Sequence, residues 1–279
     1  KEFKLMKKTL MALAVAASAL MSGQVMADVS WQQPGNLDQT VNFGGTITKP
    51  EYQNQWVWGV GAGFDSFQSS FTDLSEDKTE LTFAAKENMP VLVGKVTEAF
   101  PLDFQAGYGA APQIQFSGFD GNKIEMVSND RSSVSLQIPV KGKDSLQSGV
   151  FTLTGTAQTL VMYHAKGNDM AFFGSVYSKQ PGQIFYGGAP ENAVSYSGLV
   201  SFGGLGSDDL LALVTKKYPD VTKKGGNTPM EGTIDRISGG AASYAFGIKA
   251  GVSQKVKFNE AVTENTEWVA PLHITVSYS

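Results

Sequence analysis

The chain has 279 residues, no cysteine, 31 glycines, two histidines and 17% charged residues. Hydrophobic residues make up 42% of it and aromatic residues 11%, so the chain can bury a substantial core and is not disordered. The missing cysteines exclude disulfides, thiolate metal sites and cysteine nucleophiles. The net charge of −4 argues against binding nucleic acid through a basic patch.

The first element in chain order has the three parts of a secretory signal peptide. Two lysines follow Met6, an apolar run extends from Leu10 to Met21, and small residues end the segment at Ala27. The run is shorter than the roughly 20 residues of a membrane-spanning helix. We therefore predict that residues 1–27 are a signal peptide, with residues 1–5 as extra residues before the methionine, and that the product is exported.

The next element, residues 28–48, is predicted to be an N-terminal extension that carries a strand. Its 11 residues from Leu37 to Ile47 alternate between two faces and span roughly 36 Å when extended. Four large apolar side chains on one face supply roughly 6–12 kcal/mol if each is fully buried. That face consists of Leu37, Gln39, Val41, Phe43, Gly45 and Ile47.

From residue 49 to residue 279 the pattern is that of many short strands. Apolar and polar residues alternate in short runs between clusters of Gly, Pro, Asn, Asp and Ser, and no 20–50-residue repeat is present. This pattern is typical of an all-β sandwich or barrel. The clearest runs are Leu81–Phe83, Val91–Gly94, Gln113–Phe116, Lys123–Val127, Ser133–Val140 and Val150–Thr156.

Two local signals stand out within this region. Residues 120–122 read Asp-Gly-Asn and predict a hairpin turn, because these residue types tolerate positive φ. Ser207–Tyr218 predicts a short amphipathic helix with Ser207 as its N-cap, acids in its first turn and lysines in its last. We place this helix in an insertion around 205–240, of which residues 220–240 are expected to form an exposed loop or lid.

The last element is the clearest strand in the sequence. Apolar or aromatic side chains occupy every second position from Trp268 to Tyr278. Such a strand needs a core on one face, and an unpaired edge beside a core is a template for another strand. A closed sandwich in which both terminal strands are ordinary members explains the alternation equally well. The candidate accepting edge consists of Leu272, Ile274, Val276 and Tyr278.

Several blocks in chain order carry a resemblance to a known family. They are residues 6–19, Val41–Ile47, Tyr52–Gly61, Pro90–Lys95, Thr97–Phe100, Pro112–Ile114, Ile184–Gly188 and Trp268–Leu272. Together they resemble the K88 (F4) type fimbrial major subunits of enteric bacteria, a chaperone–usher pilin family whose shaft subunit is also the adhesin. The lack of cysteine is similar as well.

The resemblance implies an incomplete immunoglobulin-like sandwich, the pilin fold, with an inserted subdomain that contains short helices. It implies that a periplasmic pilus chaperone holds the edge formed by Leu272, Ile274, Val276 and Tyr278, until an outer-membrane usher exchanges the chaperone for a neighbouring subunit's strand. The fibre would lie at the cell surface and bind a host glycoprotein or glycolipid receptor. The donor strand implied in this way contains Leu37, Val41, Phe43, Gly45 and Ile47.

No constellation of residues indicates catalysis, a cofactor or a metal. His164 and His273 stand in no metal-ligand spacing, and His273 is expected at the surface. The glycine run Gly59–Gly63 lacks the Lys-Ser/Thr of a phosphate-binding loop and fits a bend at a strand end better. No G-x-S-x-G elbow is present. We therefore predict that the protein is not an enzyme.

Sugar recognition needs only aromatic faces and a few polar groups. Tyr163, His164, Lys166 and Asn168 are candidate glycan contacts, although core aromatics and a polar turn account for the same residues without a ligand. We expect a structural and adhesive fimbrial subunit. The alternatives are a minor subunit of the same organelle, an outer-membrane β-barrel protein or, third, a secreted jelly-roll glycosidase.

Overall fold

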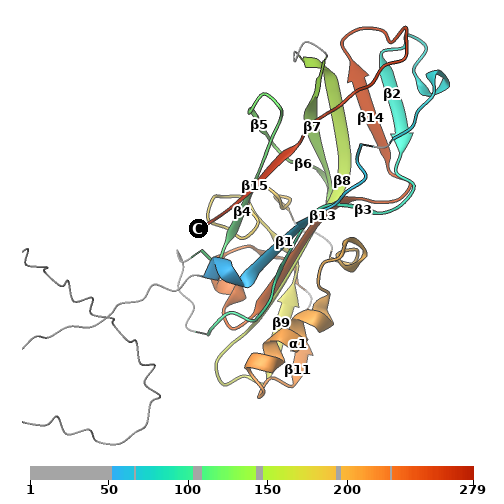
Figure 1. Cartoon of the computed structure of the whole chain (residues 1–279). Helices are drawn as coiled ribbons and strands as arrows, with labels where there is room; N and C mark the ends of the chain where they lie inside the picture. The colour runs from blue at the N-terminus through green and yellow to red at the C-terminus, as the bar shows by residue number, and fades with distance from the viewer. Residues whose placement is uncertain (1–51, 66, 103–108, 143–146, 193–195, 227) are drawn as a thin grey trace, which may run out of the picture. The chain divides into compact units, whose positions relative to one another are not determined.

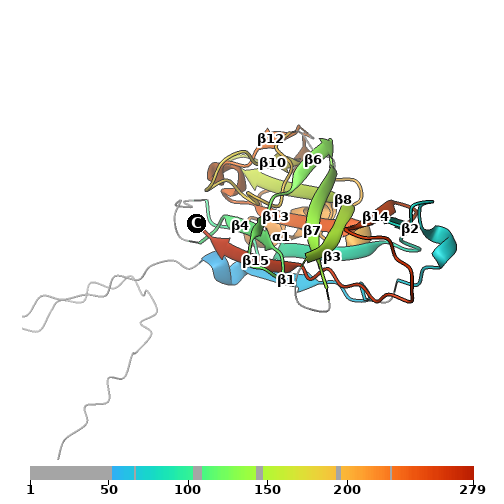
Figure 2. The same cartoon turned by 90° about the horizontal axis from the view of Figure 1, so that it is seen from above.

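The computed structural model describes residues 52–65, 67–102, 109–142, 147–192, 196–226 and 228–279 (Figures 1 and 2). Most of these residues lie in β-strands, and one α-helix is present among them. The predicted all-β fold class is therefore confirmed. Each of the short runs that the sequence marks as a strand lies within or overlaps a strand of the structure.

The largest sheet is organised around β8 (Gln147–His164), which all of its pairing partners meet antiparallel. One edge of β8 pairs with β7 and then with β9, and the other edge pairs with β14 and then with β13. Its two ends therefore belong to two different parts of the sheet (Figure 1). The order is β1 (Trp56–Val60), β3 (Met89–Val96), β13 (Ala241–Ile248), β8, β14 (Ser253–Phe258) and β2 (Glu80–Ala84), with β7 (Ser133–Lys141), β9 (Met170–Gly174), β6 (Val127–Asp130) and β11 (Lys223–Gly225) attached beside this path.

A smaller sheet covers part of the large one. It contains β15 (His273–Tyr278), β4 (Pro112–Ser117) and β5 (Lys123–Ile124) in that order. Phe116 of β4 meets Phe246 of β13 edge-on, with ring centroids 5.8 Å apart, so the two sheets share one core. A third pair, β10 (Val176–Tyr177) and β12 (Met230–Glu231), is parallel.

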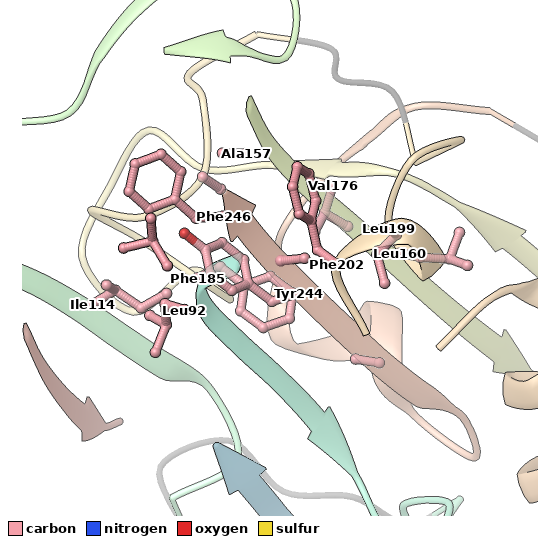
Figure 3. Close-up of a cluster of buried hydrophobic side chains, with 14 of the residues drawn as sticks. Leu92, Ile114, Ala157, Leu160, Val176, Phe185, Leu199, Phe202, Tyr244 and Phe246 are labelled. Atoms are coloured by element: carbon pink, nitrogen blue, oxygen red, sulfur yellow. The ribbon is translucent and has the colours of Figure 1, made fainter. Parts of the chain in front are cut away.

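The centre of the core lies on β13, in which every residue is buried. Figure 3 shows its aromatic side chains Tyr244 and Phe246 among residues from other strands and loops. The Tyr244 hydroxyl donates a hydrogen bond to the carbonyl oxygen of Gly188 at 2.8 Å, which satisfies the polar group of an otherwise apolar position.

The predicted helix is observed as α1 (Ser207–Lys217), with Leu210 and Val214 buried. The sequence predicts Ser207 as the N-cap of this helix, but the N-cap in the structure is Gly206. The reason is that the Asp209 carboxylate accepts the Gly206 N–H at 2.8 Å and so takes the capping role. Four short 3-10 helices complete the description: η1 (Tyr52–Gln55), η2 (Phe71–Asp73), η3 (Val200–Phe202) and η4 (Ile234–Ile237).

The predicted turn between β4 and β5 is confirmed. Phe116 pairs with Ile124, and Gly121 has a φ of 76°, which its lack of a side chain permits.

The expectation of a loop or lid at residues 220–240 is wrong. This stretch contains β11, β12 and η4, and β11 pairs in parallel with β9. Lys223 of β11 forms a 2.6 Å ion pair with Asp169. Lysines are common on edge strands because they discourage further pairing. The composition of β11 is therefore compatible with an edge strand as well as with a loop.

Candidate functional site

An open groove reaches down to the core between the two sheets, and its volume is about 1670 Å³. A complete sandwich would cover such apolar residues with a further strand. We call this cavity the open groove. Its floor is formed by Leu81 of β2, Val91 of β3, Ile138 of β7, Phe151 and Leu153 of β8, Ile248 of β13 and Phe258 of β14.

One wall of the open groove is the last segment of the chain. The lining residues run from Glu264 to Ile274, at the start of β15. Every second side chain from Trp268 to Tyr278 is half-buried, and those between are exposed. Among the described strands, β15 pairs with β4 alone. β15 therefore offers a free strand edge where the wall ends, and before β15 the wall is tied to β7 by Val269, whose carbonyl oxygen accepts the Lys141 N–H at 2.8 Å.

The opposite wall begins at the end of β1 and continues through residues 61–65, 67–71 and 74. Val60 is 71% exposed. A side chain at Gly61 would collide with the carbonyl oxygen of Pro90, and Gly63 has a φ of 85°. The glycine run thus serves a close backbone approach and a turn at a strand end, as the sequence had indicated.

Aromatic rings surround the part of the open groove next to Trp268, which precedes β15 in the chain. The Trp268 ring centroid is 5.5 Å from that of Phe151 and 5.9 Å from that of Phe83. Phe67 belongs to the opposite wall, and its ring centroid is 4.6 Å from that of Phe83. Both walls therefore present aromatic faces to this space.

The other end of the same two walls is closed. The Trp58 indole N–H of β1 donates a hydrogen bond to the Tyr278 hydroxyl of β15 at 2.9 Å. Trp56 stacks on Trp58 with ring centroids 5.8 Å apart, and its indole N–H donates to the carbonyl oxygen of Ala110 at 3.0 Å. Phe185 and Tyr244 fill the space behind these rings. We call these five aromatic residues the closed end.

The closed end is uncharged at neutral pH. Burial raises the pKa of the Tyr278 hydroxyl, and the hydrogen bond from Trp58 lowers it in part. Burial alone raises the pKa of Tyr244. Both hydroxyls therefore act as neutral hydrogen-bonding groups, and neither contributes charge to the groove.

The structure divides the predicted accepting edge into two pairs. Leu272 and Ile274 line the open groove. Val276 and Tyr278 continue the same half-buried face but lie beyond the groove, toward the closed end. The predicted donor residues Leu37, Val41, Phe43, Gly45 and Ile47 lie outside the described residues.

The four candidate glycan contacts do not form one exposed cluster. Tyr163 is half-buried and stacks on Phe172 at 5.9 Å, and Lys166 is exposed. Asn168 uses its side-chain oxygen to accept the Met170 N–H at 2.9 Å. His164 is 6% exposed and packs against Tyr218, so its burial contradicts a direct surface contact. His273, by contrast, is exposed as predicted.

Sequence reasoning missed the closed end, although one local signal was present. Trp56 and Trp58 stand two positions apart and so face the same side of a strand. Nothing local links them to Tyr278, because that contact joins the first and last of the described strands.

No group of three or more acidic or histidine side chains able to hold a metal occurs among the described residues. Along the same residues, no helix has the length and apolar character needed to cross a bilayer.

The fold and the open groove define a pilin-type subunit. The family of major and minor fimbrial subunits, K88 type, matches residues 6–279. K88 fimbrial protein AC of Escherichia coli is 30% identical over 293 residues, which cover 98% of this chain and 100% of that protein. F41 fimbrial protein of the same species is 28% identical over 287 residues, again covering 98% and 100%.

A third relative, the K88 minor fimbrial subunit FaeI of Escherichia coli, is 27% identical over 164 residues, or 58% of this chain and 60% of that protein. The chain belongs to the K88 family of fimbrial subunits. It is thus a component of an extracellular surface appendage, and this family is a structural one and not an enzyme class.

Proposed function

We propose that the chain polymerises by donor-strand complementation, in which Leu37–Ile47 of one subunit fills the open groove of the next. The observation that carries this proposal is a folded sandwich whose core is reached by a groove of about 1670 Å³ beside the free edge of β15. A strand with apolar side chains on one face is the chemical complement of such a groove. Head-to-tail filling does not close on itself and builds a fibre.

An antiparallel donor beside β15 has to come from another subunit. Trp56, where β1 starts, lies at the closed end, whereas the donor's last residue, Ile47, would lie toward Glu264 at the far end of the wall. The wall from 264 to 274 spans roughly 34 Å when extended. Residues 48–51 link the donor segment to η1, and the five steps from Ile47 to Tyr52 span at most roughly 18 Å. The link is too short for a subunit to fill its own groove in this direction.

The same groove explains the need for an assembly partner before polymerisation. A free strand edge beside apolar side chains invites aggregation in a newly exported subunit. We propose that a periplasmic chaperone covers the edge from Leu272 to Tyr278, and that an outer-membrane usher exchanges it for the donor strand of the next subunit, which occupies the open groove. The wall's alternation of half-buried and exposed side chains suits both occupants in turn.

The proposal is tested by a pair of substitutions on opposite faces of the donor segment. Phe43→Asp places a charge on the face that enters the groove, and we expect fibres to be lost while chaperone-bound monomer remains. Asn42→Asp adds the same side chain to the other face and should leave fibres intact. Deletion of residues 37–47 should act like Phe43→Asp, and fibres assembled from the deletion variant would refute donor-strand complementation.

We propose adhesion to host glycoconjugates as a second function of the same fibre. Tyr163 stacks on Phe172, and the exposed Lys166 follows three positions later in the chain; an aromatic face and a polar group are what sugar recognition requires. Glycan-array binding by assembled fibres should fall at least tenfold in a Tyr163→Ala, Lys166→Ala variant. Unchanged binding would place the receptor site elsewhere.

A further inference from the structure

We infer that the closed end is a stop that sets the register of the donor strand, so that the donor covers the wall from Glu264 to Ile274 and ends short of Tyr278. This inference rests on the proposed donor-strand complementation and specifies how the groove positions its occupant. Trp58 and Tyr278 are the positioning residues, because they join the two walls.

The first argument is that the closed end has no space for donor side chains. Trp58 is packed so tightly over β3 that even a Cβ atom at Gly94 would fall within contact of its ring. Trp58 also faces Tyr244, with ring centroids 6.0 Å apart, and Tyr244 is fully buried. A donor side chain beneath Tyr278 would have to displace rings that already fill the core.

The second argument is one of length. The wall that lines the open groove runs from 264 to 274, which is 11 positions. The alternating segment of the chain runs from 37 to 47, which is also 11. Pro34 and Gly35 stand just before it and Pro50 just after it, and both residue types end extended segments. The donor segment and the open wall therefore match in extent.

An antiparallel donor in this register is fully specified. Leu37 lies opposite Ile274, Val41 opposite Ala270, and Ile47 opposite Glu264. Antiparallel pairing is the commoner arrangement, and β15 already pairs antiparallel with β4. From Leu37 to Phe43 each inward donor residue then meets a half-buried wall residue between Ile274 and Trp268, whereas Gly45 and Ile47 lie opposite the exposed Thr266 and Glu264.

In the competing register, the donor strand is shifted by four residues along β15 toward Tyr278. There Val41 faces Ile274 and Leu37 faces Tyr278, so the donor runs into Trp58. Residues 264–267, which line the groove, would be left uncovered. This register forces the donor into a core that aromatic rings already fill, and we therefore reject it.

The lack of native cysteines makes the register measurable by disulfide cross-linking in assembled fibres. Val41→Cys is combined in turn with Ala270→Cys, Leu272→Cys and Ile274→Cys. Side chains directly opposite each other on paired strands lie roughly 4.5–5.5 Å apart at Cβ, close to disulfide geometry, and those two positions away do not. We expect the link to 270 to form between subunits at least tenfold more than the link to 274.

Trp58→Ala opens the closed end and should shift the preferred cross-link from position 270 toward 272 or 274. Trp58→Phe removes the hydrogen bond but keeps an aromatic ring, so it should shift the preferred cross-link less. A preferred link to 272 or 274 with Trp58 intact would overturn the inference, as would fibres in which none of the three links forms. Absence of fibres in the parent chain itself would instead refute donor-strand complementation.

Discussion

The two ends of the sandwich are bounded by the same pair of walls and yet are built differently. At the closed end, Trp58 of β1 and Tyr278 of β15 are joined by a hydrogen bond over a core filled with aromatic rings. In the open groove, Trp268 stands half-buried over a floor that nothing in the described residues covers. The chain thus completes one part of its core by itself and leaves the other to an incoming strand.

The comparison is tested most strongly by removing a tryptophan from each end. Trp56→Ala empties a site that is 6% exposed and should lower the free energy of unfolding of the monomer by about 3–5 kcal/mol. Trp268→Ala should cost about half of that or less, because part of its ring surface is open to water. Urea titration of the two monomers measures the difference. Equal losses would show that the two ends are packed alike.

A smaller effect is expected from adding a methyl group at two glycines on neighbouring strands. A Cβ at Gly94 would fall within the Trp58 ring, so Gly94→Ala should destabilise the monomer by about 1–3 kcal/mol. Gly59→Ala is the matched control, because a Cβ there has no atom within 4 Å. Thermal unfolding should show a lower Tm for the first variant and an unchanged or slightly higher Tm for the second. An unchanged Tm in the Gly94→Ala variant would mean that the closed end is loosely packed.

The smallest expected effect is a dependence on alkaline pH that belongs to the closed end alone. Burial raises the pKa of Tyr278 above its unfolded value of about 10. Its contribution to stability is therefore complete below about pH 10 and is lost as the pH rises through the folded pKa. Tyr278→Phe should flatten the fall in unfolding free energy above about pH 10. Trp268→Phe, which removes no titrating group, should leave that slope as it is.

What could be predicted from the sequence is what is encoded locally. The alternation from Trp268 to Tyr278 reappears as a face of half-buried side chains, and the helix and the β4–β5 turn form where their residues indicate. Each of these depends on residues a few positions apart, so periodicity and turn chemistry suffice.

What could not be predicted depends on packing between distant segments. The contact between Trp58 and Tyr278, which divides the accepting edge into a lining part and a closed part, has no sign in either strand alone. The burial of His164 follows from the position of Tyr218 on another element. Likewise, β11 is a strand because β9 offers it a pairing edge, although its own sequence is Lys-Lys-Gly.

The bond between Trp58 and Tyr278 joins residues 220 positions apart. Contacts of such long range form late, because the entropy of closing a long loop has to be overcome first. Until β15 is in place, Trp58 lacks its hydrogen-bond partner, although β1 itself can already pair with β3. We therefore expect the closed end to be completed late in folding, and protection from aggregation to matter most before that step.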